Sequence, residues 1–213
     1  LLKHAVPFTE SLLLFSDLTQ FRLDATDLLT PETVSIDVTT QFEASLRAKP
    51  VGAGRYVFFG TKRGKYSGVR EYFVDLDTEV DDAADITAHV PAFLLGEIKK
   101  MEASSNEDML ICLSADDPTA MYIYRFYWQG NEKLQSSWSR WVMSGDVLNV
   151  SFNKSEIFVL VKYGTEVFLE RINLSEDDAT EVTTAGHGIN LDRRVKLTSG
   201  GTTTVPYTAD NIV

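Results

Sequence analysis

Short apolar runs separated by polar turns recur along most of the chain. The runs are rich in β-branched and aromatic residues and are bounded by Gly, Asp, Asn and Ser, a pattern typical of β-strands. They predict strands at Leu12–Phe15, Gln20–Leu23, Val34–Phe42, Tyr56–Phe59, Val69–Leu76, Met109–Leu113, Met121–Trp128, Trp138–Met143, Glu156–Lys162 and Glu166–Leu174. The pattern therefore indicates a mainly β fold.

The runs differ in how polar residues alternate with apolar ones. Val34-Ser-Ile-Asp-Val38 alternates strictly, which predicts a strand with one buried and one wet face. Tyr122–Trp128 is apolar with little alternation, as expected for a strand buried on both faces. Helical periodicity is scarce: the best candidate is a short helix over Asp82–Leu95, which Pro91 interrupts.

A weak repeat groups these strands. Four times an apolar run is followed by a polar turn and a second run, and the pairs begin at Leu12, Tyr56, Leu110 and Ile157, at intervals of 44, 54 and 47 residues. This is the spacing of β-propeller blades, each a four-stranded antiparallel sheet. We therefore expect a partial β-propeller of about four propeller-like blades over residues 1–175, with at most one or two short helices. A generic β-sandwich is the alternative.

The last part of the chain has a different composition. Residues 176–213 are rich in Thr, Gly and Asn and contain one basic alternating run, Asp192–Leu197. We expect a linker or the truncated start of a following domain there. The chain also lacks an initial Met, and its first residues already fit a strand pattern, so we expect an internal section of a longer protein.

Overall composition narrows the function classes. The chain has a formal net charge of −11, from 31 acidic and 20 basic side chains, so it is not expected to bind nucleic acid by neutralising phosphates. Its longest purely apolar runs, such as Ile157–Val161, are far shorter than the roughly 20 residues that a membrane-spanning helix requires. A protein that grips DNA and a protein that spans the membrane by helices are both disfavoured.

Few residues suggest metal or thiol chemistry. Cys112 is the single cysteine and lies in the apolar run Met109–Leu113, so a buried core thiol is expected. The histidines, His4, His89 and His187, have no metal-ligand spacing.

The nearest approach to a metal-binding cluster combines carboxylates with His89. On a helix, Asp81, Asp85 and His89 would share a face, with Asp82 beside them. An acidic helix start explains these carboxylates better, because they favour a helix N-terminus and the sequence lacks an EF-hand pattern. No metal site is predicted.

Two further motifs read as turns. Asp116-Asp117-Pro118-Thr119 lies between two predicted strands and has turn chemistry. Gly52 and Gly54 run into a strand rather than a helix, which favours a turn or bulge over a phosphate-binding loop. Since the chain also lacks a Gly-x-Ser-x-Gly motif, we expect no catalytic, cofactor-binding or metal-binding residues and no enzyme activity.

Trp138 and Trp141 have an unusual spacing. Three residues apart on a strand, they point to opposite faces. One is expected to anchor the core, and the other to meet a neighbouring blade or subunit. Core packing of both is the simpler alternative.

Several segments together carry a family resemblance: Leu2–Phe8, Thr39–Phe42, Arg47–Pro50 with Gly54–Val57, Ala84–Pro91 and Gln135–Trp141. They resemble the family of tail tubular protein B, the nozzle protein of short-tailed bacteriophages (podoviruses). They occur in the family's order at similar spacing over residues 1–174, whereas the chain from about Glu176 matches poorly.

The resemblance implies a structural part of the virion's short tail, made in the cytoplasm of the host bacterium. It implies a ring of copies, taken to be a hexamer, that lines the channel for DNA ejection. The implied partners are the other copies, the tail adaptor or gatekeeper protein and the tail fibre, while DNA passes without specific binding. Acidic side chains facing the channel would repel DNA and let it slide. No cofactor is implied.

Two other classes remain as alternatives. A carbohydrate-binding or glycan-hydrolysing tail module would show exposed aromatic rings beside two carboxylates about 5 to 10 Å apart. A propeller that serves as a protein-interaction platform would normally show a more regular repeat.

Overall fold

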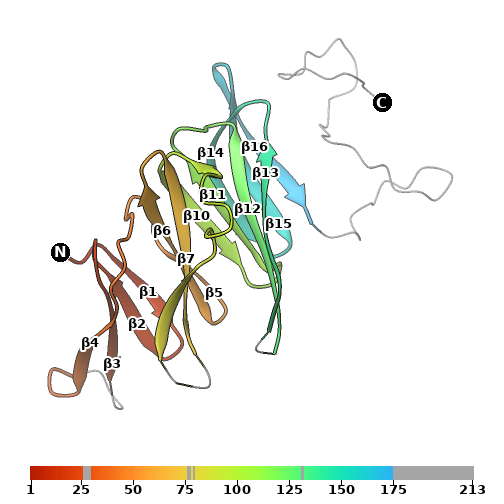
Figure 1. Ribbon diagram of the computed structural model, residues 1–213. Helices are drawn as coiled ribbons and strands as arrows, with labels where there is room; N and C mark the ends of the chain where they lie inside the picture. The colour runs from red at the N-terminus through yellow and green to blue at the C-terminus, as the bar shows by residue number, and fades with distance from the viewer. Residues whose placement is uncertain (26–29, 76–77, 79, 131, 175–213) are drawn as a thin grey trace, which may run out of the picture.

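The computed structural model describes residues 1–25, 30–75, 78, 80–130 and 132–174, and its strands form four antiparallel sheets, here named A to D (Figure 1). Sheet A contains β1 (His4–Phe8), β2 (Ser11–Phe15), β3 (Gln20–Ala25) and β4 (Val34–Thr40). Sheet B contains β5 (Val51–Ala53), β6 (Tyr56–Arg63), β7 (Tyr66–Val74) and β8 (Asp81–Asp85), and β9 (Leu94–Leu95) pairs with β7. Sheet C contains β10 (Ile98–Ser104), β11 (Met109–Ser114), β12 (Ala120–Gln129) and β13 (Glu132–Val142). Sheet D contains β14 (Asp146–Asn153), β15 (Glu156–Tyr163) and β16 (Glu166–Asn173).

Each sheet is a meander in which strands adjacent in sequence are adjacent in space, except that β9 pairs with β7 rather than with β8. Tight turns connect them: Gly64 and Gly164 adopt φ of 64° and 60° between β6 and β7 and between β15 and β16. Such positive φ angles favour glycine, so these residues allow two-residue connections. The four sheets follow one another in chain order as a stack (Figure 1).

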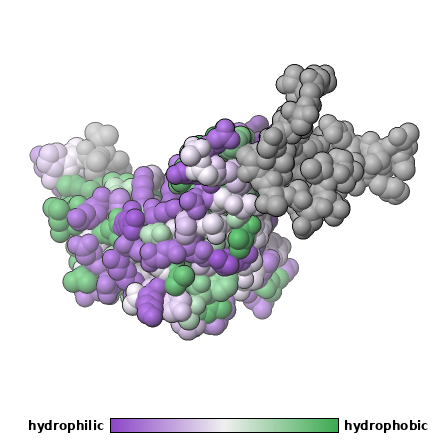
Figure 2. Space-filling view, turned by 90° about the horizontal axis from the view of Figure 1, so that it is seen from above, coloured by the Kyte–Doolittle hydropathy of each residue, from purple (hydrophilic) through white to green (hydrophobic). Residues whose placement is uncertain are grey.

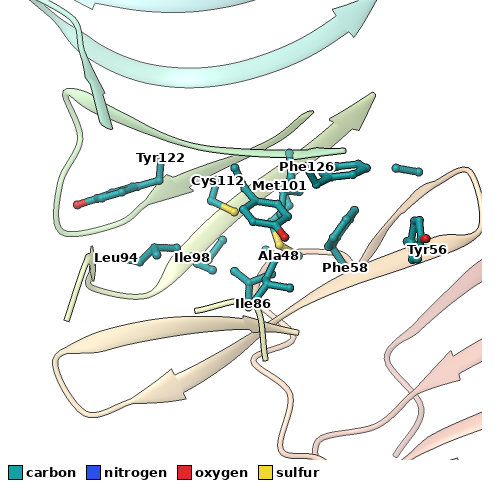
Figure 3. Close-up of a cluster of buried hydrophobic side chains, with 14 of the residues drawn as sticks. Ala48, Tyr56, Phe58, Ile86, Leu94, Ile98, Met101, Cys112, Tyr122 and Phe126 are labelled. Atoms are coloured by element: carbon teal, nitrogen blue, oxygen red, sulfur yellow. The ribbon is translucent and has the colours of Figure 1, made fainter. Parts of the chain in front are cut away.

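Three hydrophobic seams hold the stack together. The A–B seam contains Val6, Phe8, Leu13, Phe15, Val57, Phe59 and Tyr72. The B–C seam contains Tyr56, Phe58, Ile98, Met101, Leu110, Cys112, Tyr122, Tyr124 and Phe126 (Figure 3). The C–D seam contains Met109, Ile111, Met121, Ile123, Val150, Ile157, Val159 and Val161. Each fully buried large side chain contributes of order 2 kcal/mol through removal of apolar surface from water.

The two inner sheets bury both faces. On β6, Val57 and Phe59 pack in the A–B seam while Phe58 packs in the B–C seam. On β11, Leu110 faces sheet B and Ile111 faces sheet D. This explains the lack of alternation in the apolar runs, and it confirms the expected mainly β architecture of propeller-like antiparallel sheets.

The expected repeat also matches the sheets. Its four paired runs become β2–β3, β6–β7, β11–β12 and β15–β16, one pair in each sheet. The further runs Val34–Phe42 and Trp138–Met143 supply the outer strands β4 and β13.

The helix expected over Asp82–Leu95 is wrong. Asp81–Asp85 is strand β8, paired with β7, and residues 86–93 form turns and bends before β9. Ala83 is buried in the A–B seam, so tertiary packing overrides the weak helical pattern. Within the described parts of the chain every regular element is a strand. These parts contain no helix that is long and apolar enough to cross a membrane.

The burial expected for β4 is also wrong. Val34, Ile36 and Val38 share one face of the strand and are 37%, 56% and 53% exposed. They lie on the face of sheet A that points away from sheet B, because the opposite face carries the seam residues. Apolar atoms gather at the left of Figure 2, at the end of the stack where sheet A lies. The predicted linker over 176–213, its basic run and His187 lie outside the described residues.

Candidate functional site

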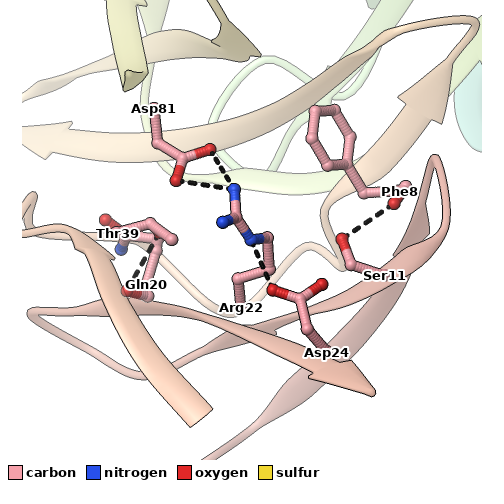
Figure 4. Close-up of polar contacts among 7 residues, drawn as sticks. All are labelled: Phe8, Ser11, Gln20, Arg22, Asp24, Thr39 and Asp81. Carbon is pink, nitrogen blue, oxygen red and sulfur yellow. Dashed lines mark hydrogen bonds and ion pairs between the residues drawn. The ribbon is translucent and has the colours of Figure 1, made fainter. Parts of the chain in front are cut away.

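Two of the three carboxylates that were weighed as a metal-binding cluster, Asp81 and Asp85, pair with arginines. Asp81 on β8 accepts hydrogen bonds from Arg22 Nη1 on β3 through both carboxylate oxygens, at 3.1 and 3.0 Å, which links sheets A and B (Figure 4). Arg22 Nε donates to Asp24 at 2.7 Å, and this bond raises the pKa of Arg22. Asp85 pairs with Arg63 and accepts a hydrogen bond from the Thr87 hydroxyl. Among the described residues no group of three potential ligands could hold a metal ion.

A second cross-sheet ion pair lies in the B–C seam. Glu71 on β7 is 1% exposed and pairs with Lys133 on β13. Burial raises the pKa of Glu71, and the nearby Lys133 ammonium opposes that shift. Sequence reasoning missed this pair, because its members are 62 residues apart and each looks like an ordinary surface charge.

The turn at Asp116–Thr119 is confirmed and does more than reverse the chain. Asp117 accepts hydrogen bonds from Arg140 Nε and Nη2 at 2.9 and 3.0 Å and from the Tyr122 hydroxyl at 2.6 Å. The backbone oxygens of Pro118 and Thr119 accept bonds from Val147 and Met143. The turn therefore fixes how sheet C passes into sheet D. The sequence signal for it was present only as Asp before Pro.

Trp138 and Trp141 point to opposite faces of sheet C, as predicted. Trp138 packs on the B–C seam, and its Nε1 donates to the Ile86 oxygen at 2.9 Å. Trp141 packs on the C–D seam. One residue pair thus serves two neighbouring seams.

The remaining motifs behave as structural features. Cys112 is fully buried in the B–C seam, and burial raises the pKa of its thiol. Gly52 lies in β5, and Gly54, at φ 60°, lies in the turn that leads into β6. His4 Nε2 lies 2.9 Å from the Leu46 oxygen.

Two surface hollows test the carbohydrate alternative. One, of about 220 Å³, is lined by the rings of Tyr56, Phe126 and Trp128 but by a single carboxylate, Asp108. Tyr56 and Trp128 stack on each other, with centroids 5.3 Å apart, rather than presenting a free platform. The other, of about 230 Å³, contains the carboxylates of Asp17, Glu43 and Glu97 but no aromatic ring. Neither hollow combines aromatic rings with two carboxylates.

Residues 1–212 match the sequence pattern of a protein family described as "Bacteriophage nozzle protein". The chain belongs to the bacteriophage nozzle protein family. A relative, the tail tubular protein gp12 of Escherichia phage T7, is 33% identical over 201 residues, covering 93% of this chain and 25% of that protein. The chain thus spans about a quarter of the length of this curated relative.

Solved structures show a similar fold. Hsv2 of Kluyveromyces lactis matches with a TM-score of 0.52 at 12% identity, covering 93% of this chain and 58% of that chain. A structure of the same protein with a complete loop 6CD matches with a TM-score of 0.51 at 11% identity, covering 84% of this chain and 50% of that chain. At these identities the likeness concerns the fold alone.

Membership in the nozzle family makes the chain part of a structural component of the virion tail. A structural family of this kind suggests a non-enzymatic role. The three seams and their cross-sheet ion pairs hold the described structure together.

Proposed function

We propose that this chain is a rigid, non-catalytic section of the wall of the DNA channel in a phage tail. The observation that carries the proposal is the stack of four sheets whose inner members bury both faces, in a chain of the nozzle family. Closely packed seams resist deformation, because a well-filled core has few alternative packings. A conduit wall needs that property and no catalytic group.

The charge distribution supports a wall along which DNA slides. The chain has 31 acidic and 20 basic side chains, and several of the cations are already paired with carboxylates. Arg22, Arg63, Lys133 and Arg140 each form such a pair. Cations engaged in this way are less available to phosphates, and the excess negative charge repels DNA.

The proposal extends to the arrangement in the tail. Copies form a ring, a hexamer in the intact tail, that contacts the adaptor or gatekeeper protein and the tail fibre and participates in DNA ejection. Residues 1–175 act as one unit of about four blades, and residues 176–213 lead into another part of the longer protein. The protein comes from a phage or a prophage.

Fluorescence anisotropy with a labelled 30-base-pair duplex tests the DNA part of the proposal. At 50 mM salt the chain is expected to bind more weakly than about 10⁻⁴ M, the weak limit of ordinary non-specific binding. The variant Glu10→Lys with Glu107→Lys still has a net charge of −7, so it should bind only slightly more tightly, and that gain should vanish as salt rises. Micromolar binding by the unaltered chain would contradict a passive wall.

Cryo-electron microscopy of virions that carry the full-length protein tests the location. The four-sheet stack is expected to repeat around the channel, next to the adaptor protein. A position on the outside of the tail, remote from DNA, would overturn the channel assignment without affecting the family assignment.

A further inference from the structure

The β12–β13 hairpin passes over sheet B with a charged pair beneath it. Residues 126–130 and 132–136 are called the arm here. Its register changes between Tyr127 and Trp128, where a β-bulge leaves Leu134 without an opposite residue. Tyr127 and Leu134 are exposed, whereas Phe126 packs in the B–C seam.

Glu71 provides the fixed half of the charged pair. It lies in the middle of β7, opposite Phe58 on β6 and Ala84 on β8. Lys133 binds one of its carboxylate oxygens, Oε2. The other, Oε1, is buried, and neither it nor the buried Trp128 Nε1 makes a hydrogen bond of normal geometry. The Trp128 indole nevertheless lies close enough to Glu71 to lower its pKa. A buried carboxylate with one strong partner depends heavily on the position of that partner.

The arm provides the other half. The Lys133 side chain is 18% exposed, and its ammonium lies 4.8 Å from the centroid of the Trp128 ring. It also donates to the Tyr124 hydroxyl at 3.2 Å. Trp128 in turn stacks on Tyr56 of sheet B, with an angle of 13° between the rings. Cation, indole and phenol rings therefore form one layered contact between the arm and sheet B.

Such a pair is a poor source of net stability. Removing two charges from water costs about as much as their attraction returns, so apolar residues of similar size often serve as well. Buried polar pairs are best attested as devices that select one register among several. A hairpin with a bulge needs such a device, because a shift of one residue turns every side chain to the other face.

We propose that the Glu71–Lys133 pair sets the register of the arm on sheet B and contributes little to overall stability. The geometry makes Lys133 a positioning residue, since it places Trp128 on Tyr56. Slippage of the arm by one residue would point Lys133 away from Glu71 and leave a buried charge unpaired. This inference does not depend on the channel function and concerns the fold that carries it.

The test measures two properties of the full 213-residue chain: its overall stability, and whether the arm adopts a single register on sheet B. The double variant Glu71→Leu with Lys133→Leu removes both charges, and Lys133→Arg keeps the charge. The matched control is Glu156→Leu with Arg171→Leu, which removes an exposed pair on sheet D. The readouts are the denaturation midpoint, hydrogen exchange of arm peptides, and the indole N–H signal of Trp128, assigned with Trp128→Phe.

In the double variant the midpoint is expected to stay level or rise, while the Trp128 signal splits and arm amides exchange at least tenfold faster. Lys133→Arg and the control should each keep one Trp128 signal and unchanged exchange. A single Trp128 signal at its original position with unchanged arm exchange in the double variant would overturn the proposal. Failure of the double variant to fold would overturn it as well, because the pair would then be a source of stability.

Discussion

Gly96 lies directly against Asp116: a β-carbon built on Gly96 would come within 2.5 Å of Asp116 Cβ. Gly96 adopts φ 75°, donates its N–H to the Lys65 oxygen and accepts a hydrogen bond from the Ser67 hydroxyl at 2.7 Å. The residue therefore joins the edge of sheet B to the turn between β11 and β12. Space and backbone conformation both require glycine there.

We predict that Gly96→Ala destabilises the fold by about 2 kcal/mol or more, from left-handed strain plus the steric clash with Asp116. Gly64→Ala is the matched control, because Gly64 has φ 64° and nothing within 4 Å of its built β-carbon. It should cost only the strain, about 1 kcal/mol. Urea denaturation measures both. Equal losses would show that Asp116 moves aside without cost.

The contact between Arg22 and Asp81 gives a second prediction. Asp81→Asn should reduce the free energy of unfolding by about 1 kcal/mol, because the carboxylate is largely buried while Arg22 remains a third exposed to screening water. Raising salt to 1 M should shrink the difference. Glu156→Gln, which breaks the exposed pair with Arg171, should change the unfolding free energy by less than about 0.5 kcal/mol. A loss of similar size in the two variants would mean that the A–B seam gains nothing from its ion pair.

The sequence predicted the parts of the fold that depend on local pattern. The paired apolar runs placed the central strands of all four sheets, and the spacing of Trp138 and Trp141 predicted two different seams. The strands β5, β9, β10 and β14 went unrecognised: β5 and β9 have only three and two residues, and charged or polar residues interrupt the apolar patterns of β10 and β14. Strand β8 was mistaken for a helix, because its acidic residues hide the one buried contact of Ala83.

Contacts between distant segments could not be predicted from a single sequence. Arg22 and Asp81, or Glu71 and Lys133, are distant along the chain, and each charge alone resembles a surface residue. The burial predicted for one face of β4 was wrong for a related reason. Alternation shows that Ile36 and Val38 share a face, but only the order of the sheets shows which face meets sheet B.

Cys112 gives a prediction on reactivity. Burial raises the pKa of its thiol, so the reactive thiolate is scarce throughout pH 7 to 9. Reaction with Ellman's reagent should be on the order of 100-fold slower in the folded chain than in 6 M guanidinium chloride. Its rate should also follow the opening of the B–C seam. Rapid labelling of the folded chain, at a rate that rises steeply between pH 7 and 9, would show that the thiol reaches solvent.

The buried Glu71 gives the last prediction, on pH. Burial raises the pKa of Glu71 in the folded state above its value in the unfolded chain, so the folded state holds this proton more tightly. Its contribution to stability is therefore complete below the unfolded pKa, about 4.3, and is lost as pH rises through the folded pKa. Other carboxylates titrate in the same range, so the effect has to be isolated by comparison with Glu71→Gln, which does not titrate.

Relative to Glu71→Gln, the unaltered chain should gain unfolding free energy as pH falls from 7 to 4.5. The measurement is the difference between the two chains in urea denaturation at half-unit pH steps. Asp24→Asn serves as the control, because this variant removes a carboxylate that is not buried. The difference in unfolding free energy between the unaltered chain and Asp24→Asn should show no such gain on acidification. A difference between the unaltered chain and Glu71→Gln that moves the opposite way would show that Lys133 outweighs burial and lowers the pKa of Glu71.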